Sequence, residues 1–137
     1  MKARLFRLMW VAVILGVLFF PGCKKSESSE YSQLYHLWEW VQSSGGIAGV
    51  IMTPASEGYT QSINFEENGT YTKYRNNLVV GSGTFTISSA VSMLDQQEYD
   101  MVVFDDGSPP QAITNISDNG LTLREDCVDC FTHTYQR

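Results

Sequence analysis

The stretch from Gln61 to Asn77 decides the fold, and it reads QSINF-EENGT-YTKYR-NN. Two short runs, 61–65 and 71–75, are rich in Ile, Phe, Thr and Tyr, the composition typical of β-strands. The Asn68-Gly69 pair between them supplies the positive φ angles that a tight hairpin requires, and Asn76-Asn77 makes a second turn. The stretch therefore predicts two antiparallel strands in a chain of hairpins.

The same pattern extends in both directions along the chain. Further short runs that alternate with turn residues predict strands at 37–43, 78–88, 99–104, 111–116, 121–124 and 131–136. Gly81 and Gly83 lie inside one of these runs, where glycines commonly mark a sharp bend. We therefore expect an all-β fold, a small eight-stranded antiparallel up-and-down barrel, because closure removes exposed strand edges. Such a barrel has an interior that side chains fill or that holds one small ligand.

Length and charge set limits on function. The chain has 137 residues, enough for one domain, and its 9 basic residues against 15 acidic ones give a formal net charge of -6. An acidic chain is a poor partner for a phosphate backbone, so we expect no nucleic-acid binding.

The amino-terminal segment predicts export. Three basic residues precede an apolar run at 8–20, which is shorter than the roughly 20 residues that a spanning helix needs, so residues 1–22 are predicted to be a signal peptide. The polar residues that follow predict a flexible tether at 23–30, and the barrel domain is then expected at 31–137.

The position of Cys23, directly after Gly22 at the end of the apolar run, resembles the lipobox of bacterial lipoproteins. In that family signal peptidase II cuts before the cysteine, which is then acylated. The resemblance implies a protein attached to the membrane through lipid on Cys23, in the bacterial cell envelope and on the periplasmic side of the outer membrane. The alternatives are an uncleaved anchor and cleavage by the ordinary signal peptidase.

The barrel segment itself is similar to the bacterial lipocalin-like lipoproteins. The similarity is carried by 34–40, 45–47, Pro54, 58–60, 63–65, 69–71, 83–87 and 125–137. In that family an early Trp packs across the closed end of the barrel under a late basic residue, and the resemblance assigns these roles to Trp38 and Arg137. It also implies a barrel that binds small apolar molecules.

Candidate ligand-binding residues come from two regions. The predicted strands contribute Trp40, Phe65, Tyr71, Phe85 and Met101 as interior residues. A long connection at 44–60, glycine-rich but with apolar residues, contributes Ile47, Ile51 and Met52 as a lid over the barrel mouth, as in lipocalin-like barrels. The alternatives are that these apolar residues plug a packed barrel or form an extra short strand.

Cys127 and Cys130 form a Cys-x-x-Cys motif between two predicted strands. In an oxidising compartment we expect a small disulfide, because neighbouring acidic residues disfavour the thiolate that redox catalysis needs. One alternative is a zinc site in which His133 and either His36 or Asp129 join the two cysteines, and another is a pair of free thiols. We expect no metal and no cofactor.

Nothing in the spacing of the two histidines predicts a Ser-His-Asp arrangement, and the acidic pairs lie at turns. We therefore expect a non-catalytic, monomeric, membrane-anchored lipoprotein that binds a small apolar or amphiphilic ligand in the barrel. The alternative is a protein-interaction module of the cell envelope, with a packed barrel and the 44–60 connection as its contact surface.

Overall fold

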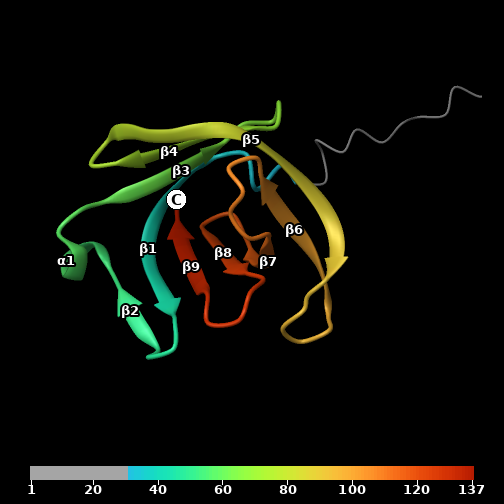
Figure 1. The fold of residues 1–137 in the computed structure, drawn as a ribbon. Helices are drawn as coiled ribbons and strands as arrows, with labels where there is room; N and C mark the ends of the chain where they lie inside the picture. Colours follow the sequence, from blue (N-terminus) through green and yellow to red (C-terminus); the bar gives the residue numbers. More distant parts are fainter. Residues whose placement is uncertain (1–30) are drawn as a thin grey trace, which may run out of the picture.

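The computed structural model describes residues 31–137, which form a closed antiparallel β-barrel (Figure 1). The first strand pairs with both the second and the third, and from the third onward each strand pairs with the next along the chain. Pairing of the last strand with the first closes the barrel. The predicted all-β, eight-stranded, up-and-down barrel is confirmed, with one short additional strand. The strands are β1 (Leu37–Gly45), β2 (Val50–Met52), β3 (Gln61–Phe65), β4 (Thr70–Arg75), β5 (Leu78–Val91), β6 (Glu98–Phe104), β7 (Gln111–Ile116), β8 (Gly120–Glu125) and β9 (Phe131–Gln136).

The predicted signal peptide at 1–22, the tether at 23–30 and the lipid attachment site at Cys23 lie outside the described residues. Within residues 31–137, no helix has the length and apolar character needed to cross a membrane.

Both predicted turns are present, but only one contains two consecutive positive φ angles. Between β3 and β4 Gly69 has a φ of 83° while Asn68 has no positive φ, whereas Asn76 and Asn77 between β4 and β5 have φ angles of 49° and 63°. Two consecutive positive φ angles match the right-handed twist of the flanking strands. The predicted ranges 61–65, 111–116 and 131–136 coincide with β3, β7 and β9.

The connection at 44–60 differs from the predicted lid. It contains β2 and the short helix α1 (Pro54–Glu57), so the alternative of an extra short strand is the one found. Thr53 caps the helix, because its hydroxyl accepts a hydrogen bond from the Ser56 amide at 3.2 Å. β2 pairs with β1 on the same edge as β3, but farther along. Residues 40–42 of β1 lie between the residues that pair with β3 and those that pair with β2, and they have no strand partner on that edge.

One half of the barrel interior is filled with side chains. Trp38 is fully buried, and its indole Nε1 donates a hydrogen bond to the Leu34 carbonyl at 2.9 Å. The guanidinium carbon of Arg137 lies 5.9 Å from the centroid of the Trp38 ring, so the structure brings these two predicted residues together at one end of the barrel. The buried cluster comprises Leu34, Trp38, Ile63, Phe65, Tyr71, Phe85, Val102, Phe104, Leu121 and Leu123.

Met101 does not face the interior as predicted. Neighbouring residues of a strand point to opposite faces, and Val102 belongs to the interior cluster, so Met101 lies on the outer face of β6. It is buried there because the turn between β5 and β6 folds over this face. An Arg124 Nη1 to Asp95 Oδ2 ion pair of 2.9 Å fixes the turn, and the hydrogen bond from Arg124 lowers the pKa of Asp95 to about 2.

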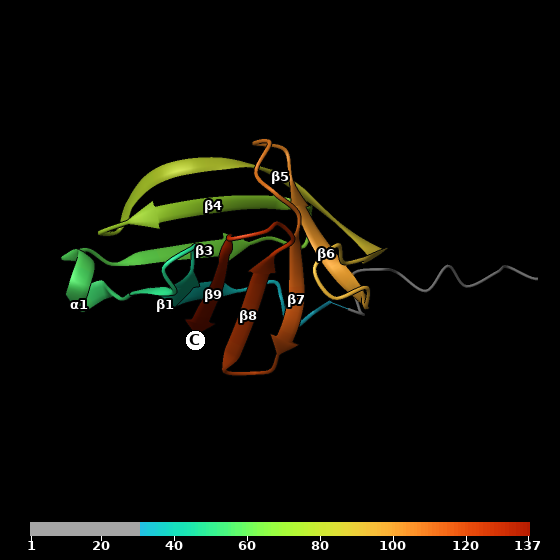
Figure 2. The same cartoon turned by 60° about the horizontal axis from the view of Figure 1, so that its bottom comes forward.

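Figure 2 shows β1 and β9 side by side, and Gly45 marks the end of this seam. A Cβ at Gly45 would collide with the Cys130 carbonyl oxygen and the Phe131 Cα, whereas a Cβ at Gly81 meets nothing within 4 Å.

Replacing Gly45 with Ala should therefore weaken barrel closure and lower the free energy of unfolding by about 1–3 kcal/mol, the usual cost of overpacking. Gly81→Ala, the matched control, should leave it unchanged or slightly higher. Urea unfolding followed by tryptophan fluorescence measures both, and equal values for the two variants would contradict the seam geometry.

Candidate ligand-binding cavity

The other half of the barrel is hollow. A cavity of about 280 Å³ lies beyond the filled half, toward the end of the barrel where β1 finishes and β9 begins. It is lined by Trp40, Ser43, Met52, Tyr59, Gln61, Ser62, Ile63, Lys73, Ser108, Gln111, Glu125, His133 and Tyr135. The cavity thus combines aromatic and aliphatic surface with many polar groups.

Trp40 forms the main aromatic wall. Its indole stacks on the ring of Tyr59 with a centroid distance of 6.2 Å and an interplanar angle of 19°. Tyr59 follows α1 and is covered on its side by Arg75, whose guanidinium carbon lies 4.5 Å from the ring centroid. The stack closes the gap that the β1 edge leaves between β3 and β2.

A bulge in β1 aims Ser43 into the same cavity. Along β9, Tyr135 pairs with Trp40 and the next residue pairs with Gln42, so one residue of β1 is skipped. Without the bulge, Trp40 and Ser43 would point to opposite faces, because they are three residues apart. With it, both face inward, and the indole Nε1 donates a hydrogen bond to the Ser43 Oγ at 2.8 Å.

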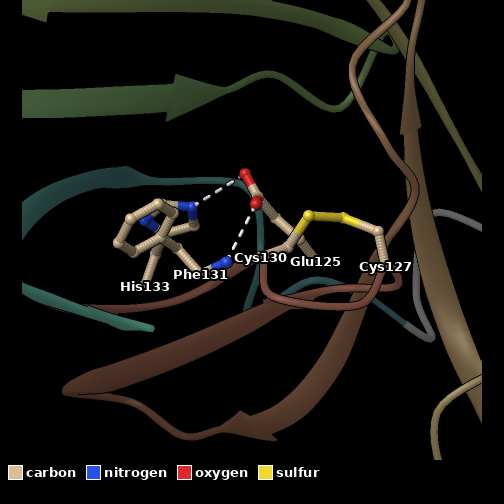
Figure 3. Close-up of a disulfide and its surroundings, with 5 residues drawn as sticks. All are labelled: Glu125, Cys127, Cys130, Phe131 and His133. Carbon is tan, nitrogen blue, oxygen red and sulfur yellow. Dashed lines mark hydrogen bonds and ion pairs between the residues drawn. A yellow bond between two sulfur atoms is a disulfide. The ribbon is translucent and has the colours of Figure 1, made fainter. Parts of the chain in front are cut away.

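A chain of hydrogen bonds continues from Ser43 through His133 to Glu125. The Ser43 Oγ lies 2.7 Å from His133 Nδ1, and His133 Nε2 lies 3.2 Å from Glu125 Oε1. His133 thus links the Ser43 hydroxyl, which accepts from Trp40, to Glu125 through its two ring nitrogens, whose donor and acceptor roles follow from the tautomer. Figure 3 shows the carboxylate of Glu125 receiving this bond and a second one of 3.0 Å from the Phe131 amide.

Ser43, His133 and Glu125 share the composition of a hydrolase triad, an arrangement that the sequence did not predict. Ser43 is only 3% exposed, and its oxygen accepts the indole hydrogen bond, which opposes nucleophilic attack. The arrangement works best as a framework that fixes the cavity wall, and the absence of catalysis stays a prediction. No local sequence signal could reveal the chain, because Ser43 and His133 meet only through the β1–β9 pairing.

Two opposite formal charges line the cavity, those of Lys73 and Glu125. Lys73 Nζ donates to Asp106 Oδ2 at 2.8 Å, and this bond, with two from Ser108, holds the pKa of Asp106 well below its usual range. Burial, followed by the nearby charge of Glu125, raises the pKa of the Tyr135 hydroxyl, so this tyrosine stays uncharged.

Five lining residues have side-chain polar groups that make no hydrogen bond to any residue of 31–137. They are the hydroxyls of Tyr59, Ser62 and Tyr135 and the carboxamides of Gln61 and Gln111. Gln111 is the most buried of them, at 8% exposed. None of these polar atoms is sealed from solvent, so a ligand or water can supply the partner.

Cys127 and Cys130 form a disulfide with a Cα–Cα distance of 5.5 Å in the turn between β8 and β9 (Figure 3). The Gly46 amide donates to the Cys130 carbonyl at 3.4 Å, so the turn also contacts the end of β1. In this state neither sulfur is a thiolate ligand. His36 lies against Trp38 in the filled half, away from the cysteines, and so does not complete the alternative zinc site.

The predicted ligand-binding residues separate into three groups. Trp40 and Met52 line the cavity. Phe65, Tyr71 and Phe85 belong to the filled half, and Met101 lies on the outer face of β6. Ile47 and Ile51 are 90% and 63% exposed and do not line the cavity, so neither forms a lid over it.

A second hollow, of about 510 Å³, lies at the opposite end against Tyr31, Tyr35 and β5. Its wall includes one of the predicted ligand-binding residues, Phe85, whereas the cavity lined by Trp40 includes two, Trp40 and Met52, and is the more enclosed of the two. The latter is therefore the candidate site.

Ser43→Ala should remove, at a buried position, the acceptor of the Trp40 indole and the hydrogen-bond partner of His133 Nδ1. We expect the free energy of unfolding to fall by about 1–3 kcal/mol, the cost of leaving buried polar groups unpaired. Ser44→Ala, the control on the opposite face of β1, should change it by less than about 0.5 kcal/mol. Chemical denaturation measures both, and a Ser43→Ala protein as stable as the control would show that the chain of hydrogen bonds is absent.

Comparisons with known proteins do not assign the chain to a family. No protein-family model matches it, and no curated protein or solved structure does so either. A function for this chain is therefore inferred from the geometry of its cavity.

Proposed function

We propose that this protein binds a small amphiphilic molecule in the cavity lined by Trp40. The observation that supports this most strongly is the combination of an aromatic wall with cavity-lining polar groups that make no hydrogen bond to residues 31–137, above all the carboxamide of the buried Gln111. Pockets for small molecules characteristically pair apolar walls with a few polar groups that fix the orientation of the ligand.

The size of the cavity limits the ligand. Its volume of about 280 Å³ is at the lower end of the range of roughly 300–1,000 Å³ that is usual for small-molecule sites. The filled half of the barrel, with Trp38, Phe65 and Phe104 at its centre, leaves no continuation for a long acyl chain. A compact molecule with a flat or short apolar part fits these limits.

An amphiphilic ligand fits better than a wholly apolar one. An apolar molecule would cover Gln111 and Tyr135 without giving them hydrogen bonds, and each buried group left unpaired costs about 1–3 kcal/mol. A ligand that carries its own polar group avoids this cost while it still contacts Trp40, Met52 and Ile63.

We further propose that the barrel works beside a membrane of the bacterial envelope, held by lipid on Cys23, as a non-catalytic lipocalin-like lipoprotein. The support is the lipobox-like sequence before Cys23 and the resemblance of the barrel segment to lipocalin-like lipoproteins. The seven polar residues of the tether after Cys23 span at most about 25 Å, so the barrel would stay close to the bilayer.

A protein-interaction module is the second candidate, and the segment at 44–60 favours it. Ile47, Val50 and Ile51 are all exposed around the β1–β2 turn, and clustered exposed apolar side chains mark contact surfaces. In that case Ile51 would contact a partner protein, while the cavity would hold only water.

Substitutions on β2 separate the two candidates. Met52 lines the cavity, and its neighbour Ile51 points away from it, so Met52→Trp should fill the cavity and Ile51→Trp should not. With 4-propylphenol as a small uncharged amphiphile, isothermal titration calorimetry should detect binding to the native protein and to Ile51→Trp, and at least about tenfold weaker binding to Met52→Trp. No binding to the native protein, or equal binding to both variants, would rule out this cavity as the site.

Cys23→Ala should move the protein from the membrane fraction to the soluble fraction, because the thiol that carries the lipid is removed. Ser26→Ala, a control in the tether, should stay with the membrane. Fractionation by ultracentrifugation and immunoblotting measures the distribution. If Cys23→Ala also sediments with the membrane, the anchor is not lipid on this cysteine.

A further inference from the structure

We propose that the cavity selects an uncharged head group of the carboxamide class, one that offers both a hydrogen-bond donor and an acceptor, and that Gln111 is the residue that selects it. This inference rests on the proposed function of the cavity. It specifies the chemistry of the ligand's polar end, which neither the volume of the cavity nor its aromatic wall determines.

The position of Gln111 directs its side chain inward. It is the first residue of β7, and it pairs with Val102 of β6 on one side and with Glu125 of β8 on the other. Paired residues share a face of the sheet, Val102 belongs to the interior cluster, and Glu125 lines the cavity. Gln111 therefore projects into the cavity between two inward-facing neighbours.

The hydrogen-bonding capacity of Gln111 is unused. Its carboxamide presents one carbonyl acceptor and two N–H donors, and none of them bonds to a described residue, although the residue is more than nine-tenths buried. The complementary group is another planar amide edge, which accepts from the N–H and donates to the carbonyl at the same time.

The polar groups of Ser43, His133 and Glu125 in the cavity already make hydrogen bonds within the protein. Ser43 accepts from Trp40 and is hydrogen-bonded to His133 Nδ1, and His133 Nε2 is hydrogen-bonded to Glu125. The second oxygen of Glu125 accepts from the Phe131 amide. The other lining residues whose side chains make no hydrogen bond to a described residue are all less buried than Gln111; they are Tyr59, Gln61, Ser62 and Tyr135.

The charges of the lining disfavour an ionised head group. Lys73 of the cavity lining is paired with Asp106 and so is not free to neutralise a ligand carboxylate. A carboxylate beside Gln111 would therefore lose its hydration without gaining a counter-ion. Both oxygens of Glu125 carry hydrogen bonds, so a ligand cation would have to compete with His133 and the Phe131 amide for this carboxylate.

Three probes of the same shape test this directly. Benzamide, benzoate and benzamidinium are flat and nearly isosteric, and they differ in carrying a neutral, a negative and a positive head. Titrated into the full-length protein and followed by ligand-observed saturation-transfer NMR, benzamide should bind about tenfold or more tightly than either ion. Equal affinities, or a preference for either ion, would overturn the inference.

Variants at Gln111 assign the selection to this residue. Gln111→Leu should weaken benzamide binding by about tenfold and leave the two ions unchanged, and Gln111→Glu should shift the preference to benzamidinium. Gln136→Leu, at an exposed position near the end of β9, is the control and should bind all three probes as the native protein does. A preference for benzamide that survives in either folded Gln111 variant would overturn the role of Gln111.

The binding site and its head-group preference can be tested separately. If 4-propylphenol binds and the three benzene derivatives bind equally, the cavity is a ligand site but does not select an amide. If neither 4-propylphenol nor any of the three binds, the proposed function fails, and the head-group inference fails with it.

Discussion

The pairing of β1 with β9 is the constraint on which the rest of the molecule depends. It joins the first and last strands of the barrel, and it sets Trp40 opposite Tyr135 and Ser43 opposite His133. The bulge after Trp40 lets two residues three positions apart share the interior face. Without this seam the barrel would have two open edges, and neither the Trp38–Arg137 contact nor the chain of hydrogen bonds to Glu125 would form.

The cavity exists because polarity changes along the barrel axis. On several strands the inward-facing residues are apolar toward one end and polar toward the other: β4 passes from Tyr71 to Lys73, and β8 passes from Leu123 to Glu125. Bulky apolar side chains pack together and fill their half of the interior. Polar side chains need hydrogen-bond partners, so they leave room where those partners are fixed bonds, water or a ligand. A small amphiphile that carries its own donor and acceptor fits this division.

Local patterns in the sequence were sufficient for most of the fold and for little of the site. Strand composition and the Asn-Gly turn predicted the hairpins. In the glycine-rich 44–60 segment, however, a lid was the preferred prediction and the short strand β2 was only an alternative. Met101 was misplaced because composition alone does not fix which face of a strand is interior. The Ser43–His133–Glu125 chain depends on a bulge and on a pairing between distant residues, and neither leaves a local signal. Gln111 was missed because a lone glutamine at the start of a strand looks like a surface residue until its neighbours are known.

The seam itself is open to direct measurement in solution. In a two-dimensional nuclear Overhauser spectrum of isotope-labelled protein, the pairing of β1 with β9 predicts cross-strand contacts between Trp40 and Tyr135 and between Ser43 and His133. The residue between Trp40 and Gln42 should have no partner on β9. Absence of these contacts, or a set in continuous register without the skipped residue, would contradict both the closure of the barrel and the inward position of Ser43.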